Sequence, residues 1–240
     1  MNASDRNSNI TGKIYLLNLS YSDVDLHIHS MYSDGAASID EIARKAKERN
    51  LKIIAIVDHS VEHPKGLNER KARKRKIEIE QAESKYGIRI LDGVECGILE
   101  DGKIILPKHD FELVIASVHS IVPQKEMYRR LKRAIEEYDF HILGHLHAGI
   151  FSLDGRAEEY DLEILDLLEE TGKALELNTH HSAPPEETLK LCLSRKITYS
   201  FGSDAHTVSR VGDLDHAKRM AKIFLKNGRF ILDEMHNVDG

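Results

Sequence analysis

The protein has 240 residues, of which 41% are hydrophobic, and its formal net charge is −6 at pH 7. This length suffices for one full β/α barrel and leaves no room for a second sizeable domain. The negative charge argues against nonspecific binding of nucleic acid by the whole surface, and two cysteines are too few for a disulfide framework.

Residues 1–20 have little apolar content, and we expect them to form a tail and lead-in to a single domain over residues 21–240. The sequence contains no long apolar segment and no leader with a cleavage site, so we expect a cytoplasmic protein that does not associate with membranes.

Seven short apolar runs predict β-strands. They are rich in Ile, Val and Leu and lack strict alternation, which is typical of parallel strands buried on both faces. In chain order the runs are Tyr21–Asp25, Leu51–Val57, Ile88–Val94, Leu113–Val118, His141–Gly144, Ala174–Leu177 and Ile197–Ser203.

Helical segments alternate with these strands. The first begins at a capping box formed by Ser38 and Glu41 and ends near Asn50. The others are Asn68–Tyr86, Gln124–Tyr138, Glu158–Thr171, Pro185–Arg195 and Leu214–Lys226. This alternation predicts an α/β fold with a parallel sheet.

Side chains that bind metals follow six of the seven predicted strands. His27 and His29 share one face because residues i and i+2 of a strand point the same way. The later strands end at Asp58-His59, Glu95, His119, His145 and Asp204-Ala205-His206, and Asn178 follows the sixth. Such groups are costly at apolar strand ends unless they are paired or coordinated. Ligands from all round the sheet favour a closed or partly open β/α barrel, whose sites lie at the carboxyl ends of the strands.

The ordered motifs resemble those of the PHP (polymerase and histidinol phosphatase) family. They are Asp-x-His-x-His-Ser with Ser-Asp-Gly, Ile-x-Asp-His-Ser, Gly-x-Glu, Ser-Val-His-Ser, Gly-His, Glu-Leu-Asn and Ser-Asp-Ala-His, between Val24 and Arg229. The resemblance implies a distorted seven-stranded, TIM-like β/α barrel that hydrolyses phosphoesters with up to three divalent metals. The segment from Asp58 to Ser120 is similar to the PHP domain of bacterial family X DNA polymerases, and we expect a freestanding relative.

The resemblance also assigns nine ligands to three metals. His27, His29 and Asp204 would hold the first metal, and Glu95 would bridge it to a second, completed by His119 and His145. Asp34, His59 and His206 would hold the third, where some relatives have a His in place of Gly35. Imidazole and carboxylate ligands together suit Zn²⁺, Mn²⁺ or Fe²⁺.

Further residues are expected near these ligands. Asp58 would support a ligand from behind, and His147 would either do the same or face the substrate. Asn178 would orient a ligand or contact the substrate, and His180 and Arg210 would bind substrate, Arg210 as a cation for phosphate. The basic run Arg70–Lys76 is interpreted as a solvated helix face, with a grip on a phosphate backbone as the alternative.

The resulting hypothesis is a phosphoesterase in which Glu95, Asp204 and His206 carry the catalysis. Two metals about 3.5–4 Å apart would share a hydroxide that attacks phosphorus in line. We expect a small phosphomonoester substrate; the alternative is a DNA end-processing nuclease or 3′-phosphatase. An amidohydrolase is disfavoured because no strand ends in the Lys that bridges its metals. An inactive metal-dependent scaffold is disfavoured because all nine ligands are present.

Overall fold

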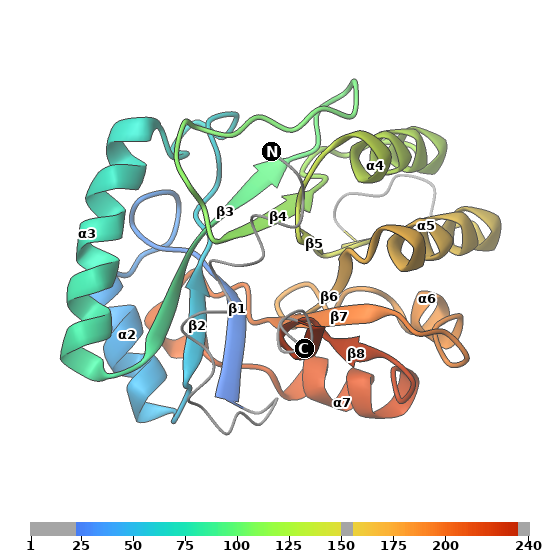
Figure 1. Cartoon of the computed structure of the whole chain (residues 1–240). Helices are drawn as coiled ribbons and strands as arrows, with labels where there is room; N and C mark the ends of the chain where they lie inside the picture. The colour runs from blue at the N-terminus through green and yellow to red at the C-terminus, as the bar shows by residue number, and fades with distance from the viewer. Residues whose placement is uncertain (1–22, 150–155, 235–240) are drawn as a thin grey trace.

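Eight parallel strands form one curled sheet in which every strand lies next to its neighbour in the sequence (Figure 1). The computed structural model describes residues 23–149 and 156–234, so the predicted tail and the start of the first predicted strand lie outside the described residues. The strands are β1 (Val24–Ile28), β2 (Ile53–Ile56), β3 (Arg89–Gly97), β4 (Leu113–Ser117), β5 (Ile142–Leu143), β6 (Ala174–Asn178), β7 (Thr198–Gly202) and β8 (Arg229–Phe230).

The sheet curls into a half-barrel. Backbone hydrogen bonds join the carboxyl end of β1 to the residues that follow β7. The backbone N–H of His29 donates to the carbonyl of Ala205 (3.0 Å), and that of Asp204 donates to the carbonyl of His27 (2.8 Å). The first seven strands therefore curve toward a ring at their carboxyl ends. The predicted count of seven strands is wrong by one, because β8 pairs with the outer side of β7. Its two residues are too few to give a periodic pattern.

Helices cover the outside of the sheet (Figure 1). They are α2 (Ile39–Glu48), α3 (Glu69–Tyr86), α4 (Gln124–Glu137), α5 (Glu158–Thr171), α6 (Glu186–Lys190), α7 (Asp215–Phe224) and α8 (Ile231–Glu234), with a 3₁₀ turn, η2 (Val208–Arg210). The capping box of Ser38 and Glu41 is confirmed. Helix α6 is shorter than predicted, since after Lys190 the amides of Leu191 and Cys192 bond three residues back in tight turns.

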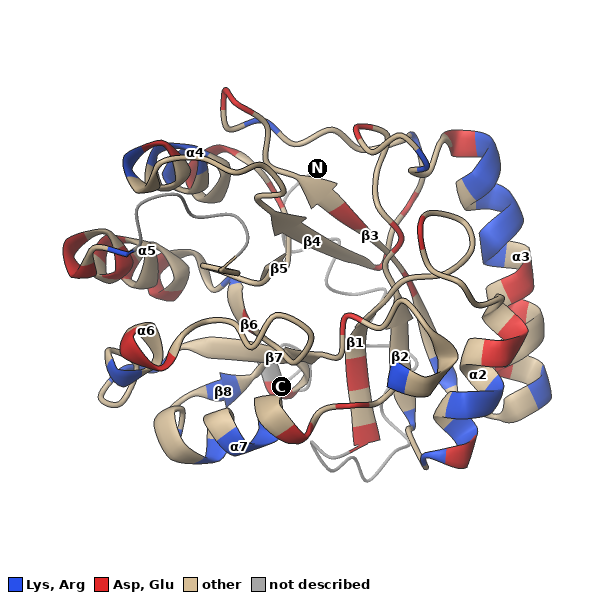
Figure 2. Ribbon diagram, turned by 180° about the vertical axis from the view of Figure 1, so that it is seen from behind, with Lys and Arg blue, Asp and Glu red and all other residues tan. Residues whose placement is uncertain are grey.

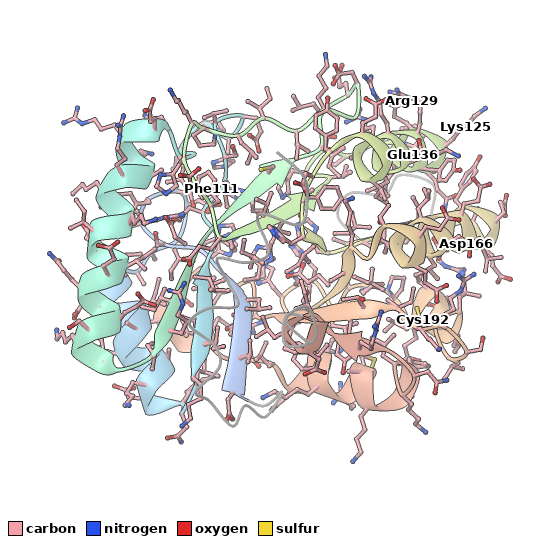
Figure 3. All side chains as sticks on the ribbon, viewed as in Figure 1. Phe111, Lys125, Arg129, Glu136, Asp166 and Cys192 are labelled. Atoms are coloured by element: carbon pink, nitrogen blue, oxygen red, sulfur yellow. The ribbon has the colours of Figure 1, made fainter. Side chains whose placement is uncertain are left out.

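The strands and the inner faces of the helices form the core. Every residue of β1 and of β2 is buried, as expected for strands covered on both faces. Cys96 and Cys192 are buried, unpaired thiols, and Figure 3 labels Cys192. Among the described residues, no helix is both long and apolar enough to cross a membrane.

Three strands extend further than the sequence predicted, one of them β6, which ends at Asn178. β1 runs to Ile28 and β3 to Gly97, so His27 and Glu95 lie within strands rather than after them. Both side chains are polar and almost fully buried. Burial at these positions is tolerated because the two side chains face further polar groups from neighbouring strands.

Candidate metal centre

The nine predicted ligands gather at the carboxyl ends of the strands. Together with His181 they fall into four groups, and within each group the ligand atoms lie within 4.8 Å of one another. The groups are His29, Asp34, His59 and His206; His27, His29 and Glu95; His59, Glu95 and His119; and His145, His181 and Asp204. Shared members join the first three groups. The fourth adjoins them and completes one cluster, because Nε2 of His145 lies 3.0 Å from Oε1 of Glu95 and Oδ1 of Asp204 lies 3.3 Å from Nε2 of His29.

Glu95 lies at the centre of the cluster and presents its two oxygens to different sets of imidazoles. Oε1 lies 3.1 Å from Nε2 of His119 and 3.0 Å from Nε2 of His145. Oε2 lies 3.0 Å from Nδ1 of His59 and 3.5 Å from Nε2 of His29. A carboxylate with this placement can bridge two cations, which a single imidazole nitrogen cannot do.

His27 is held by a carboxylate that the sequence reasoning missed. Glu176, on β6, lies with Oε1 2.6 Å from Nδ1 of His27, and its Oε2 accepts the backbone N–H of His145 at 2.7 Å. Since Nδ1 faces Glu176, Nε2 points to the cluster, 3.1 Å from Nε2 of His29. A carboxylate behind a metal-binding His fixes the tautomer and the ring orientation in this way.

Asp204 is oriented by Asn178. The amide of Asn178 donates to Oδ2 of Asp204 (3.1 Å) and to Oε2 of Glu176 (3.2 Å), and its side chain is fully buried. Asn178 therefore lies behind the ligands rather than in contact with solvent. His181, which was not predicted as a ligand, places Nε2 3.4 Å from Oδ2 of Asp204. The only sequence signal for His181 was its place in the loop after β6.

The third predicted set lies at the more open side of the cluster. Oδ2 of Asp34 lies 3.4 Å from Nε2 of His59 and 3.5 Å from Nε2 of His206. The side chain of His206 is 33% exposed, and that of Asp34 is 26% exposed. The side chains of His27 and Glu95 are at most 1% exposed, so the cluster has a buried floor and an accessible side.

The carboxylates and imidazoles shift one another's pKa. Burial alone raises the pKa of Glu95 and Asp204, but the facing imidazoles, among them His119 and His27, hold both well below the ordinary value. Burial lowers the pKa of His59, yet Asp34 and Glu95 raise it to about 10. The carboxylates of the cluster therefore stabilise positive charge. Protons on the imidazoles provide that charge when no metal is bound.

The residues fit a group of divalent cations. Two imidazole Nε2 atoms, of His27 and His29, face each other 3.1 Å apart, an arrangement in which a cation can accept both lone pairs. Within the described part of the chain, the buried Nδ1 of His29 has no hydrogen-bond partner. The donor set of imidazoles and carboxylates suits transition metals.

The two predicted supporting residues differ in their surroundings. Asp58 contacts Ser30, Ser33 and Arg75. His147 lies 2.6 Å from Asp161 of α5, so it supports the α5 side rather than a ligand.

Two of the three predicted substrate-binding residues, His180 and Arg210, lie outside the cluster of predicted ligands. His180 is exposed, and its ring centroid lies 5.8 Å from that of His206, within reach of a molecule bound there. Arg210 pairs with Asp213 at 3.2 Å on η2.

The chain matches the model of the family described as PHP domain over residues 25–180. It is 31% identical over 214 residues to the DNA polymerase/3'-5' exonuclease PolX of Bacillus subtilis, covering 84% of this chain and 37% of that protein. It is 32% identical over 215 residues to a probable phosphatase of Caldanaerobacter subterraneus, covering 82% of this chain and 81% of the relative.

Solved structures share the fold. The histidinol phosphate phosphatase of Lactococcus lactis, crystallised with zinc, L-histidinol and phosphate, superposes with a TM-score of 0.67 at 22% identity. The alignment covers 87% of this chain and 95% of that chain. A second structure, from Listeria monocytogenes and described as a putative histidinol phosphatase, gives a TM-score of 0.60 at 18% identity, with 79% and 97% of the two chains covered.

Proposed function

The chain belongs to the PHP domain family and is a metal-dependent phosphoesterase, and we propose that its substrate is a small phosphomonoester. The family prediction made from the motifs is confirmed by the family match. The observation that carries the proposal is Glu95, whose two oxygens face two sets of imidazoles inside one cluster. This arrangement suits a centre of two or more divalent metals.

We assign the ligands as follows. His27, His29 and Asp204 would hold one metal, and Glu95 would be shared with a second, for which His119 and His145 would be the other ligands. Asp34, His59 and His206 would hold a third, a set supported by their grouping with His29. When bound, divalent transition metals supply Lewis-acid stabilisation of the developing charge on phosphorus and acidify water at neutral pH.

Other residues of the chain orient these ligands and admit the substrate. Glu176 contacts Nδ1 of His27 and so turns Nε2 of that ring to the cluster, and Asn178 holds Asp204 in place. The substrate enters from the accessible side, where His206 and Asp34 are partly exposed; His119 is exposed to a similar degree. Asp204, His206 and Glu95 are therefore the catalytic residues of the proposal, with His180 and Arg210 as candidates for contact with the leaving group and the phosphate.

A small substrate is favoured by the likeness to enzymes of similar size. The alignment with the Lactococcus lactis phosphatase covers 87% of this chain and 95% of that chain, which was crystallised with two small molecules, L-histidinol and phosphate. The net charge of −6 also disfavours a long polyanion.

A DNA end-processing activity is the second candidate, supported by the similarity to PolX. The exposed side chains of Arg70, Arg73 and Lys74 gather on the outer face of α3, where Figure 2 shows a band of basic residues. They offer a surface for a phosphate backbone.

A substrate panel tests the two candidates. Phosphomonoesters, phosphodiesters and single-stranded DNA would be offered with Mn²⁺ or Zn²⁺ at low and at physiological salt. We expect the fastest release of phosphate from a small monoester, with little dependence on salt. Replacing Arg73, Lys74 and Lys76 by Gln would leave this rate unchanged. Selective loss of DNA hydrolysis in that variant, with DNA as the preferred substrate of the wild type, would establish the second candidate instead.

A further inference from the structure

Arg75 lies in the middle of the basic run but is fully buried. Its side chain is 0% exposed, so the prediction of a solvated helix face is wrong at this position. One guanidinium nitrogen donates to Oδ2 of Asp58 (2.8 Å) and the other to Oδ1 of Asp92 (2.6 Å) and to the carbonyl of Gly93. The guanidinium also lies 5.9 Å from the ring centroid of Phe111, which Figure 3 labels beside α3. A planar group with two carboxylate partners is fixed in direction as well as position.

Asp58, which is held by Arg75, in turn accepts hydrogen bonds from the loop that carries Asp34. Its Oδ1 accepts the backbone N–H of Ser30 (2.8 Å) and the hydroxyl of Ser33 (2.7 Å), and its Oδ2 accepts the hydroxyl of Ser30 (2.7 Å). The hydroxyl of Ser33 also lies 3.3 Å from Oδ1 of Asp34. Asp58 immediately precedes His59 in the chain. One carboxylate therefore joins the two loops that present Asp34 and His59 to each other.

Lys71, which lies one helical turn before Arg75 on α3, contacts the same two loops. Its ammonium donates to the carbonyl of Tyr32, in the loop after β1, and to those of Lys65 and Gly66, in the loop after β2. Lys71 and Arg75 are four residues apart, so both lie on the side of α3 that faces the sheet. The basic run thus has an inner face that ties loops together and an outer face that meets solvent.

We propose that Arg75 is a positioning residue for the third metal: by holding Asp58 it fixes the separation of Asp34 and His59. This inference rests on the proposed metal-dependent function. It predicts a selective effect, because the ligands on the buried floor are held by other partners. His27 is oriented by Glu176 and Asp204 by Asn178, neither of which contacts Arg75.

The test is a metal titration of the Arg75→Lys variant, with Arg73→Lys as the matched control on the exposed face of the same helix. A Lys ammonium keeps the charge but cannot hold two carboxylates in one plane. Metal-free protein would be titrated with Co²⁺ and followed by visible absorption, with the retained metal counted by elemental analysis after dialysis. We expect one metal equivalent to bind at least about tenfold more weakly, as is usual when a residue behind a ligand is lost, while the others change by less than about threefold.

Equal weakening of all equivalents, or no weakening, would overturn the inference. If Arg75→Lys does not fold, Ser33→Ala decides, because it removes the Asp58–Ser33 hydrogen bond without leaving a buried charge. It is expected to weaken the same single equivalent, and an unchanged titration would refute the proposed route. Where both variants fold, the double variant should be no weaker than the more affected single one, since both act on one path. Failure of the proposed function would be seen separately, as a wild type that binds metal but releases no phosphate, or that binds none.

Discussion

Replacing Glu176 by Gln tests how the buried floor of the metal centre is organised. Glu176 accepts hydrogen bonds at both oxygens: Oε1 from Nδ1 of His27 (2.6 Å), and Oε2 from the backbone of His145 (2.7 Å) and the amide of Asn178 (3.2 Å). A Gln side chain has the same shape but carries one oxygen and one NH₂ group. The NH₂ group must therefore face a hydrogen-bond donor, either the His27 ring or the His145 and Asn178 side.

Both orientations of the amide are costly. With NH₂ toward His27, Nδ1 must accept, the ring proton moves to Nε2, and that nitrogen can no longer bind a metal. With NH₂ toward His145 and Asn178, buried donors face one another and are left without an acceptor, which costs about 1–3 kcal/mol of stability. Loss of a carboxylate behind a ligand typically weakens metal binding by about 10–100-fold, which corresponds to about 1.4–2.8 kcal/mol at 1.4 kcal/mol for each factor of ten.

The assay is a competitive metal titration of the purified variant, followed by phosphate release at saturating metal. Glu163→Gln, on the exposed face of α5, is the matched control for the change of charge. We expect Glu176→Gln to lose at least about tenfold in affinity for one metal and to fold normally by circular dichroism. A folded variant that binds every metal within about twofold of the wild type would refute the role given to Glu176.

Three further predictions concern the same cluster. Glu95→Gln is expected to abolish phosphate release and leave the fold intact; near-normal turnover would show that Glu95 is not the bridge. At Gly202 a Cβ would lie 2.1 Å from Oε1 of Glu176, so Gly202→Ala is expected to lower metal affinity as Glu176→Gln does, measured by the same titration. Carboxylates raise the pKa of His59 to about 10, so metal must displace protons at pH 7 and its affinity must rise with pH. Calorimetry in two buffers of different ionisation enthalpy would detect the released protons, and identical heats would contradict the prediction.

The positions of the ligands could be predicted because they follow from local sequence. Polar, metal-binding side chains at the ends of apolar strands indicate a shared edge once the strands are known to be parallel. His27 and His29 needed only the two-residue period of a strand. The order of the elements was equally accessible, since each strand and helix carries its own periodic pattern.

The residues behind the ligands were missed because their partners are distant in sequence. Glu176 lies 149 residues from His27, and nothing in the run Ala174–Leu177 indicates that contact. A charged side chain inside a strand buried on both faces was nevertheless a usable signal, since it must be paired. Arg75 offered a similar signal: it shares a helical stripe with Ala72, Ile79 and Ala82, all buried. His147 was misjudged because its partner Asp161 comes from α5 rather than from a strand end.

The most direct test of the central claim is the number of metal ions that one chain binds. Protein purified without chelator, and again after addition of Mn²⁺ or Zn²⁺, would be measured by elemental analysis against its concentration. A cluster in which Glu95 joins two sets of imidazoles predicts at least two equivalents of transition metal per chain, and three when the Asp34, His59 and His206 set is filled. A content at or below trace, not recovered by added metal, would contradict the account.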